Sequence, residues 1–204
     1  MRKVLLLAFA LGGVVSAQAQ IVYDNTTNVL GFLIGAGEDE WGDAMTLAGT
    51  ERNVTGFDAM IHSNSGAFTA DLTARLYAGG SGGVDPGALL WSATVTGAAI
   101  AGGLGTYSFV VPGVLVPNDV TWTVQMTNRS NSTAVAGPRF VSPPTVGSSE
   151  DYVWDHVGGV WTDTAFGVGA NNNNFGARLT AVPEPASLTA LALGGLALLR
   201  RRRK

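Results

Sequence analysis

The clearest pattern in the chain runs from residue 68 to residue 76, with the sequence Phe68-Thr-Ala-Asp-Leu-Thr-Ala-Arg-Leu76. Apolar residues occupy every second position, and threonine, aspartate and arginine stand between them. Successive side chains of a β-strand point to opposite faces of a sheet, so this alternation is typical of a strand with one buried face. We therefore expect an antiparallel sheet that packs one face on a core.

The same alternation recurs in four further segments, which are Phe57–Ile61, Tyr107–Val111, Val120–Met126 and Phe175–Ala181. Turn-forming segments such as Gly79–Gly83 separate these runs, and no window between the two ends of the chain has a sustained helical period. About nine to eleven short strands are expected. The pattern predicts an all-β body over residues 20–180, built as an antiparallel two-sheet sandwich that is jelly-roll-like rather than immunoglobulin-like.

One hairpin can be placed in register from its loop. Gly158-Gly159 is a two-residue loop, and glycine accepts the positive φ angles that tight hairpin turns require. The predicted cross-strand pairs are Val157 with Val160, His156 with Trp161, and Trp154 with Asp163.

This register gathers a set of aromatic and polar residues on one face of the hairpin, which are Tyr152, Trp154, His156, Trp161 and Asp163. Flat rings beside an imidazole or a carboxylate suit the stacking of sugar rings, so a carbohydrate-binding face for surface polysaccharide is one hypothesis. The alternative, which we favour, is that these rings fill the sandwich core, since buried aromatic residues are commoner than binding ones. Trp91 and Trp122 are also expected in the core.

Four carboxylates fall within six residues around Trp41, namely Glu38, Asp39, Glu40 and Asp43. Calcium takes oxygen ligands from acidic loops, so a structural calcium site is a hypothesis here. The spacing does not match the twelve-residue EF-hand loop. We favour a solvated acidic loop, and we expect no other cofactor.

Composition excludes several functions. The chain has 204 residues and no cysteine, which excludes thiolate chemistry and cysteine-ligated metals. Residues 20–180 contain five arginines, no lysine and fourteen acidic residues, a net charge of −9, so nucleic acid is not an expected partner. The Gly-x-Ser-x-Gly pattern at Gly79–Gly83 lacks the strand and helix of a nucleophile elbow. We expect no catalytic residues, and a carboxylate-based glycan hydrolase ranks third among the functions considered.

Residues 1–19 have the three parts of a secretory signal peptide. Arg2 and Lys3 precede an apolar run from Val4 to Val15, and Ala17 and Ala19 supply the small residues that signal peptidase needs. The expected cut lies before Gln20. A buried N-terminal strand or helix is the alternative.

The C-terminal end has a second apolar segment. Pro183-Glu184-Pro185 is followed by the apolar run Ala186–Leu199 and by five basic residues, Arg200, Arg201, Arg202, Arg203 and Lys204. A helix over that run is about 21 Å long, short of the hydrocarbon core of about 30 Å. Basic residues remain on the cytoplasmic side, so the body is expected outside.

This order of motif, apolar segment and basic tail over residues 181–204 resembles the PEP-CTERM sorting signal of Gram-negative bacteria. The segment is also known as an ice-binding protein C-terminal domain, although its residues give no reason to expect ice binding. The resemblance implies recognition by a membrane-embedded cysteine protease of the exosortase type, with cleavage near Pro183-Glu184-Pro185. An ordinary tail anchor or stop-transfer helix is the alternative, with the same topology.

These observations predict an exported protein with a non-enzymatic body. Its expected partners are signal peptidase, an exosortase-type protease and the inner membrane during transit. Its expected location is the cell surface or the extracellular matrix, and a carbohydrate-binding module is the alternative function.

Overall fold

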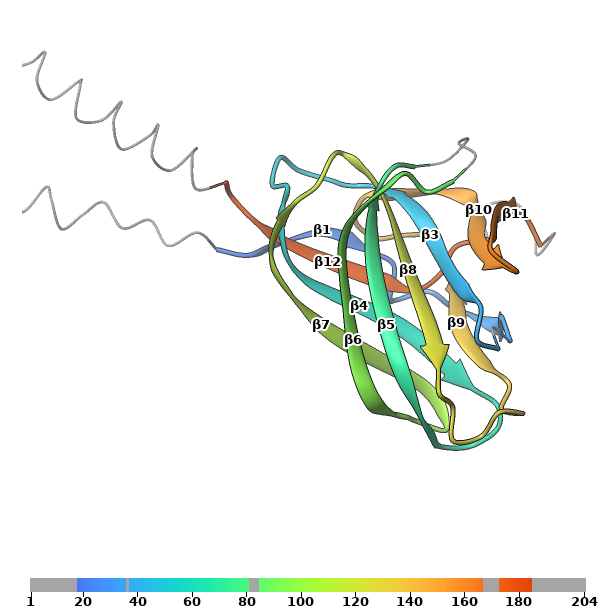
Figure 1. Cartoon of the computed structure of the whole chain (residues 1–204). Helices are drawn as coiled ribbons and strands as arrows, with labels where there is room; N and C mark the ends of the chain where they lie inside the picture. Colours follow the sequence, from blue (N-terminus) through green and yellow to red (C-terminus); the bar gives the residue numbers. More distant parts are fainter. Residues whose placement is uncertain (1–17, 36, 81–84, 167–172, 185–204) are drawn as a thin grey trace, which may run out of the picture.

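A computed structural model of the chain describes residues 18–35, 37–80, 85–166 and 173–184 (Figure 1). Within these ranges every regular element is a β-strand, and all strand pairs are antiparallel. Most of the predicted signal peptide and the predicted C-terminal sorting helix lie outside the described residues. Among the residues that are described, no helix has the length and hydropathy needed to cross a membrane.

The strands form two six-stranded sheets. Sheet I contains β1 (Gln20–Asp24), β12 (Ala177–Val182), β4 (Asn53–Ser63), β7 (Gly103–Leu115), β9 (Ala136–Val141) and β2 (Val29–Leu33). Sheet II runs in the order β11 (Val160–Thr164), β10 (Ser148–Val157), β3 (Glu40–Thr46), β8 (Asp119–Thr127), β5 (Phe68–Ala78) and β6 (Ala88–Ile100). The predicted all-β, two-sheet architecture is confirmed, with twelve described strands instead of about nine to eleven.

The core lies between the two sheets. The alternating residues of β5 from Phe68 to Leu76 point into it, as the sequence predicts. Trp122 of β8 is fully buried there, with its ring centroid 5.4 Å from that of Phe57 in sheet I. Trp91 of β6 packs edge-on against Phe109 of β7. Aromatic rings from both sheets therefore interlock across the sandwich, and the predicted core positions of Trp91 and Trp122 are confirmed.

Consecutive strands rarely lie in the same sheet. Only the steps β1 to β2, β5 to β6 and β10 to β11 remain within one sheet, and every other step between described strands crosses to the opposite sheet. Most neighbours in a sheet are therefore distant in sequence, as with β3 and β8 or β4 and β12. Neither sheet can form from one continuous segment.

The predicted hairpin register is confirmed. β10 and β11 pair Val157 with Val160, His156 with Trp161, and Trp154 with Asp163. Gly158 and Gly159 have φ angles of 61° and 84°, as the tight turn requires.

The prediction of a solvated acidic loop is wrong for Glu40 and Asp43. Glu40–Thr46 forms β3, a strand in the middle of sheet II between β10 and β8. Glu40 and Asp43 are therefore strand residues with fixed and opposite orientations rather than members of a solvated loop.

Candidate functional site

A carboxylate lies on the outer face of sheet II, which is the face turned away from the core. Glu40 of β3 is only 4% exposed, and it accepts hydrogen bonds from the Tyr77 hydroxyl at 2.9 Å and from the Thr123 hydroxyl. Arg75 Nη1 lies 2.8 Å from Glu40 Oε2. Two neighbouring strands, β5 and β8, thus supply the partners that the buried carboxylate on β3 needs.

The pairing in sheet II explains why these side chains meet. Thr123 pairs with Arg75 across β8 and β5, and Gly42 pairs with Thr123 across β3 and β8. Because Gly42 has no side chain, β8 packs closely against it, and Thr123 Cγ2 lies 2.7 Å from where a Cβ of residue 42 would stand. Burial raises the pKa of the Tyr77 hydroxyl, and the neighbouring Glu40 carboxylate raises it further, so Tyr77 is a neutral donor.

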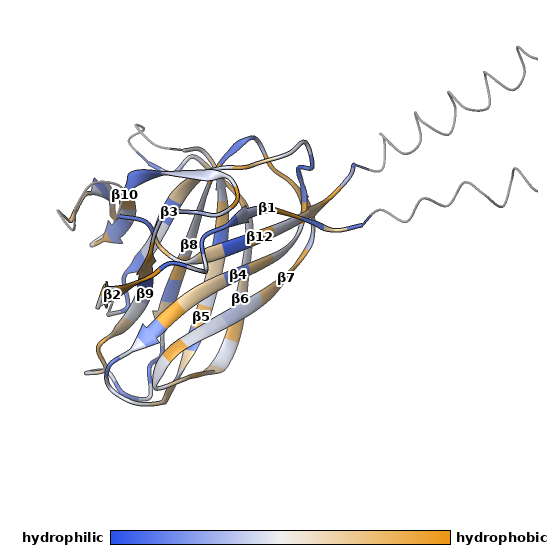
Figure 2. Ribbon diagram, turned by 180° about the vertical axis from the view of Figure 1, so that it is seen from behind, coloured by the Kyte–Doolittle hydropathy of each residue, from blue (hydrophilic) through white to orange (hydrophobic). Residues whose placement is uncertain are grey.

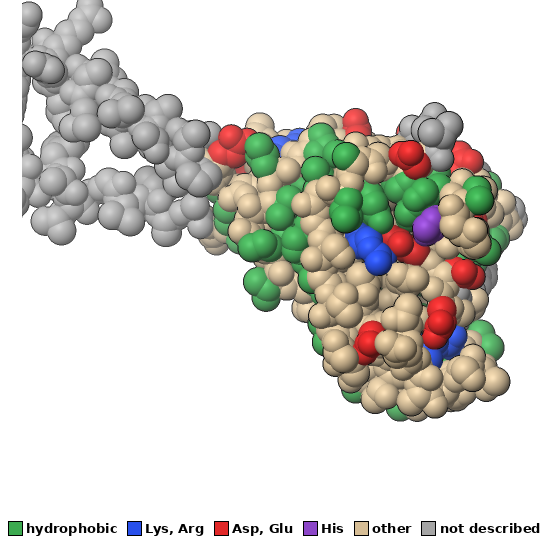
Figure 3. All heavy atoms as spheres, in the orientation of Figure 1, with side chains coloured by type: hydrophobic (Ala, Val, Ile, Leu, Met, Phe, Trp, Pro, Cys, Tyr) green, Lys and Arg blue, Asp and Glu red, His purple; other side chains and the backbone are tan. Residues whose placement is uncertain are grey.

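The β10–β11 hairpin extends over this carboxylate. The rings of His156 and Trp161 stack at 4.4 Å between centroids with an interplanar angle of 16°. Trp161 also packs edge-on against Tyr77 at 5.7 Å, and His156 Nδ1 lies 4.0 Å from Glu40 Oε2. Figure 3 shows this side of the molecule, where histidine, acidic and basic side chains lie close together among hydrophobic ones. The hairpin therefore covers Glu40 with aromatic rings.

The five residues predicted for a carbohydrate-binding face do not form one flat exposed surface. Trp154 is 1% exposed, and its ring is nearly perpendicular to that of Trp161, at 88°. Tyr152 donates its hydroxyl to Glu150, beside the irregular part of β10. Asp163 is exposed on the edge strand β11. The structure brings His156 and Trp161 together in a stack, and it buries Trp154 beneath them.

The four carboxylates predicted for calcium do not come together. Glu38 is exposed and Asp39 half-buried in the turn before β3. Glu40 and Asp43 belong to opposite faces of β3, the former among Tyr77 and Arg75 and the latter against Phe175, which precedes β12. Among the described residues, no group of three or more histidine, cysteine, aspartate or glutamate side chains is placed to hold a metal ion.

Sequence reasoning missed a buried polar network around Asp43. This side chain is completely buried, and its carboxylate accepts hydrogen bonds from the Phe175 backbone N–H at 2.9 Å and from the Ser149 hydroxyl at 3.0 Å. Burial raises the pKa of Asp43 well above its ordinary value. Burial, and then the nearby Asp43, also raises the pKa of Tyr23. The partners are 106 and 132 residues away from Asp43 in the sequence, so no local pattern indicates them.

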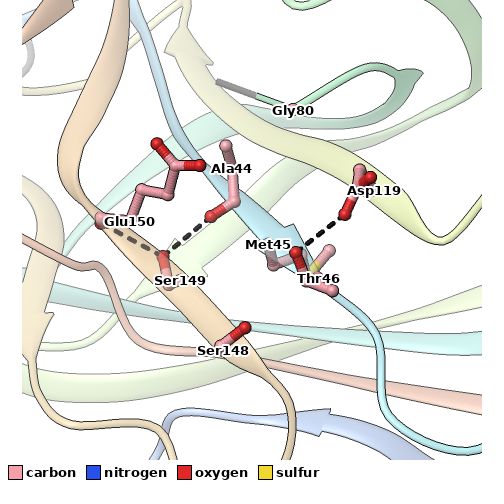
Figure 4. A pocket seen from close by; sticks show the side chains of 8 residues that line it. All are labelled: Ala44, Met45, Thr46, Gly80, Asp119, Ser148, Ser149 and Glu150. Atoms are coloured by element: carbon pink, nitrogen blue, oxygen red, sulfur yellow. Dashed lines mark hydrogen bonds between the residues drawn. The ribbon is translucent and has the colours of Figure 1, made fainter. Parts of the chain in front are cut away.

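A polar pocket of about 290 Å³ opens where β10 separates from β3 (Figure 4). Its lining includes Thr46, Asp119, Ser149 and Glu150, and the two acidic side chains lie on opposite sides of it. Asp119 accepts a hydrogen bond of 2.7 Å from the Thr46 hydroxyl, and Glu150 accepts one of 2.9 Å from the Tyr152 hydroxyl. Both carboxylates are therefore already bonded to hydroxyl groups of the protein.

The two predicted processing points lie at one end of the sandwich. Gln20, the residue after the expected signal peptidase cut, is the first residue of β1 and pairs with Ala181 of β12. β12 ends at Val182, and Pro183 and Glu184 follow it directly. Figure 1 shows that the chain leaves the sheets at this same end in both directions. Ala17, Pro185 and the basic tail from Arg200 to Lys204 lie outside the described residues.

Comparison with known families identifies the C-terminal segment. The family model of the PEP-CTERM protein-sorting motif matches residues 181–204. This match confirms the resemblance that the sequence indicates. No curated protein and no solved structure matches the chain. The chain therefore carries a PEP-CTERM sorting motif, which begins within the last strand of the described sandwich.

Proposed function

We propose that this is an exported protein whose C-terminal segment is removed by an exosortase-type protease, and whose non-enzymatic body is displayed at the cell surface or in the extracellular matrix. The observation that carries the proposal is the position of the sorting motif. It matches residues 181–204, and the last strand of the folded body, β12, ends at Val182. The sorting segment therefore follows the folded body directly, with almost no spacer between them.

The packing of β12 supports a cut on its C-terminal side. β12 lies between β1 and β4 in sheet I, and its residues Leu179 and Ala181 are completely buried. Removing this strand would expose the core and leave β1 without a partner. A cut near Pro183-Glu184-Pro185 leaves all hydrogen bonds of sheet I in place. A cut before Gln20 likewise leaves β1 whole.

The same arrangement supports the proposed topology during transit. The apolar run Ala186–Leu199 enters the inner membrane, and the basic tail from Arg200 to Lys204 remains on the cytoplasmic side. Signal peptidase and the exosortase-type protease then act at the same end of the body, because Gln20 and Ala181 are paired neighbours.

The classification of the sandwich as a jelly roll is part of this proposal. The strand orders β1-β12-β4-β7 in sheet I and β3-β8-β5-β6 in sheet II support it. Among these eight strands every step except β5 to β6 crosses to the other sheet, as in a jelly roll, and β2, β9, β10 and β11 extend this framework.

The absence of enzymatic activity is also a proposal. The proposal is supported by the acidic side chains described above, which are buried or bonded to other side chains of the protein. Glu40 is held by Arg75 and Tyr77, and Asp43 is buried in the core. The two carboxylates of the polar pocket are bonded to Thr46 and Tyr152.

A carbohydrate-binding body has less support. Stacking on a sugar needs an open ring surface. Trp154 is buried, and one face of the Trp161 ring is stacked on His156. A glycan array with the processed protein, run with and without calcium, separates the two functions. We expect no binding in either condition, and binding that Trp161→Ala abolishes would establish the alternative.

The sorting proposal is tested by replacing Pro183, Glu184 and Pro185 with alanine in a host that contains an exosortase-type protease. An epitope tag placed after Lys204 reports whether the tail is removed. We expect the tag to be lost from the unchanged protein and retained by the triple variant. Pro117→Ala, at an exposed proline in a loop of the body, serves as the control that should still lose the tag. Equal tag removal from both variants would overturn the proposal.

A further inference from the structure

Two long strands occupy one side of the sandwich. β6 is the last strand of sheet II, and among the described strands it pairs only with β5. β7 is an outer strand of sheet I, and in the same described set it pairs only with β4. Each is 13 residues long, and they are connected through Ala101 and Gly102. Figure 1 shows them next to each other, so two unpaired sheet edges face the same direction.

Neither of these two strands carries a charged side chain. Between Asp85 and Asp119 there is no acidic, basic or histidine residue, although the body as a whole has net charge −9. Figure 2 shows β6 and β7 in pale and orange tones, without the deep blue of strongly hydrophilic residues. Proteins commonly protect edge strands with charged side chains, especially lysine, and that protection is missing here.

Large apolar side chains on these two strands remain in contact with solvent. Val110 is 88% exposed and Leu115 60% exposed on β7, and Leu89 is 55% exposed on β6. Val95 and Leu104 are also exposed. Burial of such side chains in an interface is favourable, because it removes apolar surface from water.

The irregularities of the two strands leave a regular stretch on each. Pro112 and the positive φ angle of Gly113, 82°, interrupt β7 near its end, but Gly103–Val110 pairs with β4 without a shift in register. Gly97, at φ 63°, interrupts β6, but Trp91–Val95 pairs regularly with β5. Backbone N–H and C=O groups on the outer side of these regular stretches can therefore continue the ladder into another strand.

We propose that the edge formed by β6 and β7 binds a second copy of this chain, side to side about a two-fold axis, so that both sheets continue across the interface. The charge distribution favours a second copy as the occupant. Two bodies of net charge −9 repel each other, and the uncharged edge is where they approach with the least repulsion.

The size of the edge is sufficient for a stable dimer. Thirteen residues span about 43 Å, and two sheets lie about 10 Å apart, so the edges with their side chains offer roughly 600–900 Å² per copy. A standard protein interface buries about 800 Å² per partner. Because both uncharged edges lie on the same side, one two-fold contact uses both of them and closes the assembly at two copies. This dimer does not depend on the proposed sorting.

Cysteine cross-linking tests the interface in the full chain, since the native protein has no cysteine. Single cysteines replace Leu104, Thr106 or Ser108, which face solvent along β7, and Thr162 on the opposite edge strand β11 is replaced as a matched control. After mild oxidation in intact cells, we expect a disulfide-linked dimer from at least one β7 variant and none from Thr162→Cys. Dimers from Thr162→Cys alone, or from no variant, would overturn the proposal.

A charge placed on the edge supplies a second test. The variant that combines Ser108→Lys with Val110→Lys should halve the mass measured by light scattering at tens of micromolar, because lysine opposes edge pairing. The near-ultraviolet circular dichroism spectrum verifies its fold. The control combines Val160→Lys with Thr162→Lys on β11 and should leave the dimer intact. A monomeric native protein, or a dimer that persists in the β7 variant, would contradict the proposal.

Discussion

Asp43 shows how a single residue links parts of the fold that are far apart in sequence. Its buried carboxyl accepts hydrogen bonds from Phe175, next to β12, and from Ser149, at the start of β10. Ser149 also donates to the Ala44 carbonyl at 2.7 Å. A protonated Asp43 can therefore donate to the Ser149 oxygen while Ser149 donates to Ala44. The network suits a neutral side chain at position 43, in agreement with the raised pKa.

The raised pKa of Asp43 predicts how stability depends on pH. The folded state keeps its proton at pH values where the unfolded state has lost it, so the free energy of unfolding falls as pH rises from the ordinary value of 3.8 through the folded-state pKa. Asp43→Asn keeps the hydrogen-bonding pattern of the neutral acid and removes this titration. Urea unfolding between pH 4 and pH 8 should show a smaller decline for Asp43→Asn than for the native protein. The same decline in both proteins would contradict this assignment.

Gly42 should tolerate no side chain. A Cβ atom there would lie 1.8 Å from the Trp122 carbonyl oxygen, a backbone atom that cannot turn aside. Gly42→Ala should therefore lower the free energy of unfolding by about 3 kcal/mol or more. Gly31→Ala is the matched control, because nothing lies within 4 Å of a Cβ at that position. Equal urea midpoints for the two variants would show that β3 and β8 do not approach so closely.

At the scale of elements, the β10–β11 hairpin packs over part of the outer face of sheet II. Its Trp161 contacts His156, Trp154 and Tyr77, so one ring joins β11, β10 and β5. This arrangement keeps water from the Glu40 carboxylate and from its ion pair with Arg75. The hairpin thereby stabilises a polar cluster that lies outside the core.

Truncation of Trp161 tests this structural role. Trp161→Ala removes three ring contacts and should lower the free energy of unfolding by about 1–3 kcal/mol. Val160→Ala alters the same strand at a side chain that is 61% exposed, and it should change the value by less than about 0.5 kcal/mol. Chemical unfolding followed by tryptophan fluorescence measures both variants. If the two variants lose similar stability, the hairpin is not held by this ring.

The sequence predicted those elements whose signals are local. Alternation identifies β5 and β8, and Gly158-Gly159 fixes the hairpin register because the turn chemistry lies in the loop itself. β3 was missed because Glu40 and Asp43 resemble a solvated loop until their partners are known. These partners, such as Tyr77 and Phe175, come from other strands, so only the tertiary fold makes the strand stable. The favoured prediction that the hairpin rings fill the sandwich core is wrong for Trp154, which is buried against Trp161 on the outer face of sheet II.

At the scale of the whole molecule, the first and last strands of the described sandwich are neighbours. Gln20 and Ala181 pair in sheet I, and the sorting motif matched at residues 181–204 follows without a spacer. In the proposed topology, one end of this body would lie close to the membrane, and the uncharged edge of β6 and β7 would run along its side. Neighbouring copies on the same membrane would then meet edge to edge, which connects the proposed dimer with the proposed display.

The intact mass of the protein recovered from outside the cell is the most direct measurement of the central claim. We predict a chain that begins at Gln20 and ends shortly after Val182, with β1 and β12, the first and last described strands in the sequence, complete. A mass that includes the basic residues from Arg200 to Lys204, or an end point within β12, would contradict it.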